Sequence, residues 1–356
     1  MIRELKSKPK QAREGLKLVK PQTSNHGLKM FLENGTRLAE RLVPRSLSNA
    51  ATALVEALNL NSITEKRRGR RPVLVKRRNL AGEPLANLAN AYFRKLRIPI
   101  HFLSDVKEWR RREMTSFNML NGDRFRARAS GAGTVIEDKL PGESIWDHMK
   151  RGTLSQRMLQ AAAREFHRAH QFWSDDFDGP WSHADATTTN AIYDEKTGRV
   201  RLIDFEIEHD KSLPARARHA DDLLVFLLDM VGLVSRRQWL PFALCFLSAY
   251  KEADVIAELR KRLLLPGGLA WVWWEVRTNF TAPAKVKQRL ASLRAAIAKL
   301  EIYRVAAVRA RHKRRPSIIC HAIKPRTPRA SSRTLAIKER AKAASPGKPR
   351  RLPTTR

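Results

Sequence analysis

Cysteine is scarce in this chain of 356 residues, which contains only Cys245 and Cys320. Two cysteines so far apart give neither a disulfide framework nor the spacing of a zinc site, and they favour a reducing compartment. Long apolar runs are also missing, because the longest, Leu223–Val234 and Pro241–Tyr250, are too short to span a bilayer. Residues 1–20 are basic and lack the apolar core of a signal peptide. These absences predict a cytoplasmic protein with no transmembrane segment.

Acidic residues are half as frequent as basic ones, with 35 Asp and Glu against 70 Lys and Arg and a net charge of +35. The excess is uneven, because residues 304–356 carry 17 Lys and Arg against the single Glu339. Such a tail attracts polyanions: an anionic membrane surface, a phosphorylated glycolipid or nucleic acid. A merely solvated tail explains the composition equally well. Peripheral binding at the inner membrane face therefore remains one of several alternatives.

Residues 181–206 carry most of the chemistry. Asp185 and Asn190 lie in a stretch without apolar periodicity, which indicates a loop. A short strand, a turn ending in Gly198 and a second strand running into Asp204 then predict a hairpin. The hairpin would bring a loop carboxylate and amide close to a carboxylate at a strand end. Two oxygen ligands and one spare carboxylate suit Mg²⁺ holding a polyphosphate, with the spare Asp185 facing a nucleophile.

These residues resemble the catalytic half of the protein-kinase-like phosphotransferases. His183-Ala-Asp185-Ala-Thr-Thr-Thr-Asn190 matches H-x-D-x-x-x-x-N, and Ile203-Asp204-Phe205-Glu206 matches the D-F-G element in its D-F-E form. Within that superfamily the chain is most similar to bacterial kinases that phosphorylate Kdo in the lipopolysaccharide core. Those kinases share the order of Phe166-His167, the H-A-D start and the I-D-F-E end. The resemblance covers about residues 73–228.

The resemblance implies roles for the loop residues. Asp185 would accept or orient the proton of an acceptor hydroxyl, and His183 would brace the loop. Asn190 and Asp204 would hold Mg²⁺ against ATP. Thr187 stands where many relatives carry Lys or His, so a positive charge on the acceptor side is missing there.

The resemblance also implies a nucleotide site upstream. Lys76, at the end of a short apolar strand, would contact the α- and β-phosphates, oriented by Glu113 on a helix predicted over residues 109–120. Glu137 lies in the strand and hinge segment 134–142, where relatives hold adenine. A surface lysine, a surface glutamate and a plain turn are the structural alternatives to these three assignments.

One departure concerns glycine. No G-x-G-x-x-G precedes Lys76, and only Gly69 occurs in the basic turn expected at residues 66–71. Backbone amides of a glycine-poor loop hold phosphates less closely, and the guanidinium group of Arg67, Arg68, Arg70 or Arg71 could substitute for them electrostatically. The departure favours a rival hypothesis, a catalytically inactive kinase-like scaffold whose basic tail binds nucleic acid or anionic lipid. The intact catalytic-loop and D-F-E residues oppose that rival.

The expected fold class is α+β, a bilobal protein-kinase-like fold with disordered basic tails. Its parts would be a basic disordered N-terminus over 1–26, a small β-rich N-lobe over 27–140, a helical C-lobe over 141–303 and a basic disordered tail over 304–356.

Helical periodicity fills the expected C-lobe. Asp222, near the start of a helix expected from His219, would brace the catalytic-loop backbone or cap the helix. The later helices are expected at 239–250, 255–265, 269–280 and 285–303.

The predicted function is transfer of the γ-phosphate of ATP, with Mg²⁺, to a hydroxyl of a lipopolysaccharide-core sugar or another small molecule. The open alternatives are the inactive scaffold, a protein Ser/Thr kinase and a basic nucleic-acid binder with accidental motifs.

Overall fold

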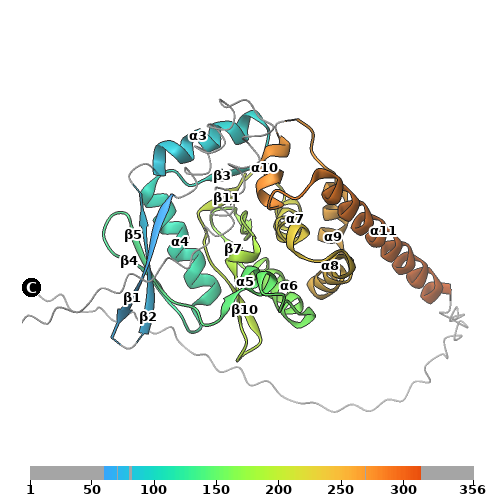
Figure 1. The fold of residues 1–356 in the computed structure, drawn as a ribbon, viewed down its shortest axis with the longest axis horizontal. Helices are drawn as coiled ribbons and strands as arrows, with labels where there is room; N and C mark the ends of the chain where they lie inside the picture. The colour runs from blue at the N-terminus through green and yellow to red at the C-terminus, as the bar shows by residue number, and fades with distance from the viewer. Residues whose placement is uncertain (1–59, 70, 80–81, 269, 314–356) are drawn as a thin grey trace, which may run out of the picture. The chain divides into compact units, whose positions relative to one another are not determined.

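The computed structural model describes residues 60–69, 71–79, 82–268 and 270–313 (Figure 1). By their contacts the residues divide into 1–306 and 307–356, and the described part of the second unit is the end of helix α11. The predicted N-terminus over 1–26, a hairpin expected at Asn34-Gly35 and most of the predicted tail lie outside the described residues. Those expectations stay predictions.

The N-terminal part is built on an antiparallel sheet of four strands in the order β1-β2-β5-β4. Its strands are β1 (Asn61–Arg68), β2 (Arg71–Arg78), β4 (Ala127–Ala129) and β5 (Thr134–Asp138). Lys76 lies on β2 opposite Ile63 of β1. The turn expected at 66–71 is shorter than predicted, because Lys66, Arg67 and Arg68 pair with β2 and the reversal needs only the residues around Gly69.

An insert of one helix and one strand separates β2 from the helix of Glu113. It consists of α3 (Gly82–Lys95) and β3 (Ile100–Phe102), and α4 (Val106–Asn121) follows. β3 pairs with β11 (Ile207–His209), directly after the D-F-E motif. The rings of Phe93 of α3 and Trp273 have centroids 4.9 Å apart, and both residues belong to a small apolar cluster that includes Ala184 of the expected catalytic loop, residues 183–190. The insert therefore covers one side of that loop.

The C-terminal part is mainly helical (Figure 1). Its elements in chain order are β6 (Glu143–Ser144), α5 (Ile145–Lys150), α6 (Gln156–Ala169), β7 (Trp173–Ser174), β8 (Gly179–Pro180), the 3₁₀ turn η1 (Thr188–Asn190), β9 (Ala191–Asp194), β10 (Arg199–Leu202), β11, α7 (Ala215–Leu233), α8 (Arg236–Tyr250), α9 (Ala253–Arg262), α10 (Ala270–Arg277) and α11 (Pro283–Lys313).

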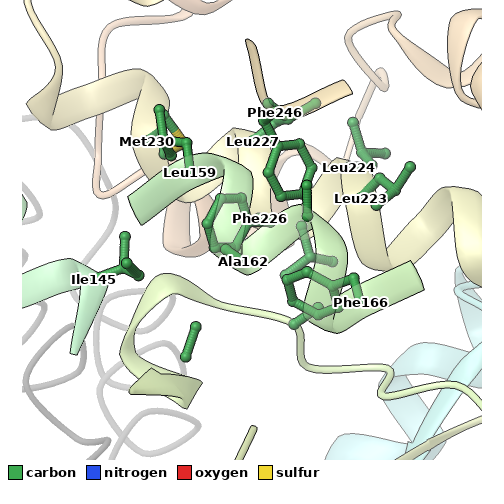
Figure 2. Packing of buried hydrophobic residues seen from close by; sticks show 14 of the residues in the cluster. Ile145, Leu159, Ala162, Phe166, Leu223, Leu224, Phe226, Leu227, Met230 and Phe246 are labelled. Atoms are coloured by element: carbon green, nitrogen blue, oxygen red, sulfur yellow. The ribbon is translucent and has the colours of Figure 1, made fainter. Parts of the chain in front are cut away.

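Helix α7 runs through the middle of the main core, with its side chains buried from Ala217 to Val231. Phe226 of α7 packs against Phe166 of α6 and Phe246 of α8, with ring centroids 5.5 Å and 4.6 Å away (Figure 2). Aromatic contacts of this kind fix the angles between helices as well as burying area. These ring contacts fix the position of α7 relative to α6 and α8.

Several helix bounds differ from the sequence expectation, among them the end of α10, which lies at Arg277 rather than residue 280. Helix α9 ends at Arg262 rather than residue 265, ahead of the helix-breaking Pro266-Gly-Gly268. Helix α11 continues to Lys313, although the pattern predicted its end at Tyr303. Residues 304–313 are rich in Ala and Arg, which are good helix formers, so nothing local stops the helix at Tyr303.

The predicted α+β architecture, with a small sheet-rich N-terminal part and a larger helical C-terminal part, is confirmed. None of the helices that the structure describes combines the length and apolar character needed to cross a bilayer.

Candidate active site

The hairpin of β9 and β10 places two of the expected site residues side by side. Its register pairs Ala191 with Leu202, and Ile203 N–H donates to the Asn190 carbonyl at 3.1 Å. Asn190, which ends η1, and Asp204, which follows Ile203, therefore lie at the same end of the hairpin. The turn and strands predicted from the sequence are confirmed.

Asn190 and Asp185 are joined directly. The Asn190 amide nitrogen donates to the Asp185 carbonyl at 2.9 Å and to its carboxylate at 3.0 Å. This uses the nitrogen and leaves the buried Asn190 Oδ1 without a hydrogen-bond partner among the described residues. Asp185 keeps some contact with solvent. Removal of its carboxyl from most of the surrounding water raises the pKa of that carboxyl to about 7. A carboxyl of this kind can exchange a proton near neutral pH.

Asp222 fixes the backbone of the catalytic loop. Its two carboxylate oxygens accept hydrogen bonds of 2.8 Å from the backbone N–H groups of His183 and Ala184. Ala184 has a φ of +69°, a conformation that costs a non-glycine residue about 1 kcal/mol or more and persists only where neighbours enforce it. The predicted bracing contact is confirmed. The N-cap alternative is wrong, because α7 begins at Ala215 and Asp222 lies in its second turn.

His183 lies beneath the loop and is fully buried. Its Nε2 lies 3.1 Å from the Ile203 carbonyl, and burial lowers the pKa of the ring. A neutral ring that donates to this carbonyl ties the catalytic loop to the strand before Asp204. The position fits a brace and not a proton donor to substrate.

Lys76 is surrounded by three carboxylates. It forms an ion pair with Glu113, and its Nζ lies 3.4 Å from Glu137 and 3.5 Å from Asp204. Burial alone would lower the pKa of Lys76, but the three carboxylates outweigh it and hold that pKa well above the usual value. The structure thus brings together the lysine and the glutamate that are 37 residues apart in the sequence.

Glu113 also reaches the D-F-E motif, because its second carboxylate oxygen accepts from the Phe205 N–H at 2.9 Å. Lys76 lowers the pKa of Glu113 against the effect of burial, whereas burial raises the pKa of Glu137 well above its usual value. Glu137 therefore belongs to the lysine cluster by its side chain, and an adenine contact from segment 134–142 stays a prediction.

The expected phosphate-binding role of the basic turn is wrong. Gly69 lies seven residues from Lys76 along β2, which is about 23 Å at the rise of an extended strand. Arginine side chains at the turn cannot reach phosphates held at Lys76. The opposite end of the hairpin, where Asn61 pairs with Arg78, is the end next to Lys76.

Several residues of the site were not anticipated. Glu206 is paired with Arg78 and accepts from the Asn61 amide, and Asp229 accepts from the Thr188 N–H at 2.8 Å. Arg277, from α10, donates to the Ala184 carbonyl at 3.2 Å. The D-F-E motif includes Glu206, so the sequence marked that residue. Asp229 and Arg277 belong to no motif, and nothing in the sequence links them to the residues that they contact.

Asn190 and Asp204 offer oxygen donors of the kind that Mg²⁺ prefers. Asn190 Oδ1 is an unpaired buried oxygen, and Asp204 supplies a carboxylate at the same end of the hairpin. No group of three or more His, Cys, Asp or Glu residues capable of holding a metal occurs in the part of the chain that the structure describes. Mg²⁺ is commonly held by one or two protein oxygens with phosphate and water completing the shell, so the residues fit it.

Comparison with known proteins by sequence gives no match, either to a protein-family model or to a curated protein.

Comparison by structure finds kinases and phosphotransferases among the matching chains. An ethanolamine kinase of Plasmodium vivax gives a TM-score of 0.33 at 9% identity, covering 67% of this chain and 79% of its own. The ADP-bound aminoglycoside phosphotransferase APH(2″)-Ib gives 0.34 at 12% identity, covering 68% and 94%. The streptomycin–ATP complex of APH(2″)-IIa gives 0.34 at 12% identity, covering 65% and 95%. TM-scores this low do not by themselves establish that two whole chains share one fold.

Proposed function

We propose that this chain is a kinase-like phosphotransferase that moves the γ-phosphate of ATP, with Mg²⁺, to a hydroxyl of a small molecule. The observation that carries the proposal is the Lys76 cluster, in which one buried lysine contacts Glu113 and Asp204 together. Phosphoryl transfer requires a cation on the phosphates and a metal-holding carboxylate next to it. Asn190, with its free buried oxygen, and Asp185 complete the set.

The roles follow from position. Lys76, held by Glu113, would contact the α- and β-phosphates, and Asn190 and Asp204 would hold Mg²⁺. When bound, Mg²⁺ would neutralise charge on the transferred phosphoryl group. Asp185 would orient the acceptor hydroxyl and take its proton as the new P–O bond forms and the bond to the leaving ADP oxygen breaks. Asp222 and His183 would keep the loop in place without touching substrate.

A small acceptor is favoured over a protein. Only residues 207–214 separate the D-F-E motif from α7, and three of them pair with β3. Protein kinases carry their activation loop in this interval, and that loop needs more chain. Apolar side chains also cover one side of the catalytic loop, among them Phe93 from the insert and Trp273 from α10. Among small acceptors, the H-A-D and D-F-E resemblance supports a lipopolysaccharide-core sugar.

The test is transfer of label from γ-³²P-ATP to a lipopolysaccharide-core oligosaccharide pool and to a panel of small polyols and sugars. The proposal predicts a labelled product with wild-type protein and none with Asp185→Ala, while Asp185→Ala still binds Mg·ATP. Asp175→Ala, an exposed aspartate outside the site, is the matched control and should label like wild type. Equal labelling by wild type and Asp185→Ala would refute the assigned role. Nucleotide binding without transfer to any acceptor would instead favour the inactive scaffold.

A further inference from the structure

Arg277, the last residue of helix α10, lies against the catalytic loop. Its side chain is only 7% exposed, and Nη2 donates to the carbonyl of Ala184, the residue before Asp185, at 3.2 Å. The guanidinium also lies over the ring of Trp273, 4.9 Å from its centroid. A buried cation is thus fixed beside the residue that would face the acceptor hydroxyl. The sequence pattern lacks a positive charge at Thr187, and Arg277 supplies one from a different element.

The guanidinium has more hydrogen-bonding capacity than the protein uses. It offers five N–H donors. Among the described residues it makes one hydrogen bond, its Nη1 lies 3.7 Å from the Asp221 carboxylate, and its buried Nε has no partner. Arg112 is also buried and its Nε is likewise without a partner among the described residues, yet its Nη atoms make three hydrogen bonds, to Asp176, Glu208 and Ser182. Spare donors on a buried charge are costly, so Arg277 is poised for a further acceptor.

Asp221 does not neutralise Arg277 on its own. The same carboxylate lies 3.3 Å from His209 Nε2 and 3.8 Å from Arg262. One carboxylate is therefore shared between Arg277, Arg262 and the His209 ring, and it does not form a close ion pair with Arg277.

We infer that Arg277 binds an oxyanion of the acceptor, a carboxylate or a phosphate close to the reacting hydroxyl, so that the acceptor is an anionic, hydroxyl-bearing small molecule. The inference rests on the proposed function and names the class of its substrate. A planar guanidinium with free N–H groups suits two oxygens of one anion. Bound there, the anion would place its neighbouring hydroxyl at Asp185, and neutral or cationic acceptors would lack this anchor.

The experiment measures binding of inorganic phosphate and of acetate by calorimetry to full-length protein saturated with Mg·AMP-PNP, a nucleotide that fills the γ-phosphate position. Arg277→Met should weaken binding of at least one probe by about tenfold or more, the loss expected for a charge-assisted hydrogen-bond pair. Arg262→Met is the matched control, because Arg262 contacts the same Asp221 carboxylate without touching the catalytic loop. This variant should bind both probes as tightly as wild type. Because it keeps the basic tails, weak binding of the probes to the tails is the same in both variants and cancels in the comparison with Arg277→Met.

The two probes separate the sources of the anion. Loss for phosphate alone points to a phosphorylated acceptor, and loss for acetate points to a carboxylated one. Should Arg277→Met fail to fold, Arg277→Lys keeps the charge and should weaken binding only a few-fold. Equal binding by wild type, Arg277→Met and Arg262→Met would overturn the inference and leave Arg277 as a loop brace. Failure of the wild-type protein to bind Mg·AMP-PNP would refute the proposed function. Absence of the anion site alone is distinguished from that result because the nucleotide still binds.

Discussion

Removal of Lys76 tests whether the buried carboxylate cluster depends on it. Lys76 and Glu113 are 2% and 0% exposed, so the charge left behind by Lys76→Met has little access to water. Loss of one partner of a buried ion pair costs about 3–5 kcal/mol. Two further carboxylates, Glu137 and Asp204, lie within 3.5 Å of the lysine and add to the repulsion. We therefore expect a loss of about 4 kcal/mol in the free energy of unfolding.

The double variant Lys76→Met/Glu113→Gln removes most of the uncompensated charge. It should be more stable than the sum of the single losses predicts, by about 2–3 kcal/mol of coupling energy. Urea unfolding of wild type, both single variants and the double variant gives this number directly. Nucleotide affinity should be lost in both variants that lack Lys76, because the regained stability does not restore the contact with phosphate.

The exposed pair Lys139–Glu65 is the matched control for this cycle. Its side chains are 32% and 30% exposed at a separation of 2.8 Å, so its coupling should be below about 1 kcal/mol. A Lys76–Glu113 coupling as small as that of the control would refute the reasoning. It would mean that hydration or protonation stabilises the carboxylates when the lysine is removed.

Three further outcomes follow from the packing around the loop. Asp222→Asn should lose about 2–3 kcal/mol in the free energy of unfolding by urea and most of the transfer activity, because one backbone N–H of the loop then faces an amide NH₂ donor instead of a carboxylate oxygen. Unchanged activity would contradict the bracing role. Burial lowers the pKa of His219 to about 3 and also lowers the pKa of the stacked His170, so the unfolded chain binds protons before the folded protein does as the pH falls. The free energy of unfolding is therefore fully present above pH 6.5 and should decrease as the pH drops toward 3. The decrease should be shallower in His219→Gln, and identical slopes would contradict this origin. Gly142→Ala should lower the melting temperature, because φ is +104° and the added Cβ would lie 2.0 Å from a backbone oxygen of β9; an unchanged melting temperature would show that the segment relaxes freely.

Local patterns predicted the elements that carry the site. The turn at 194–198 between two short apolar strands was sufficient for the β9–β10 hairpin, and the helical pattern over residues 109–120 was sufficient for α4. Such features depend on contacts between residues close in sequence, so period and turn chemistry report them.

The insert and the partners it brings could not be predicted in the same way. The insert contains β3, which is only three residues long and depends on pairing with β11. Arg277 is one arginine among many, and only tertiary packing places it on Ala184. The N-cap reading of Asp222 failed because the helix begins earlier, after Pro214, where no polar cap signals it. Long-range contacts of this kind have no local signature.

The central claim is that the residues around Lys76 and Asp204 hold Mg·ATP, and melting temperature tests it most directly. Wild type and Asp175→Ala should gain about 5 °C with Mg·ATP at a hundredfold excess over its Kd. Asp204→Ala should show little or no gain, because it lacks the carboxylate that holds Mg²⁺ next to Lys76. No gain in wild type, or an equal gain in Asp204→Ala, would contradict the proposed nucleotide site.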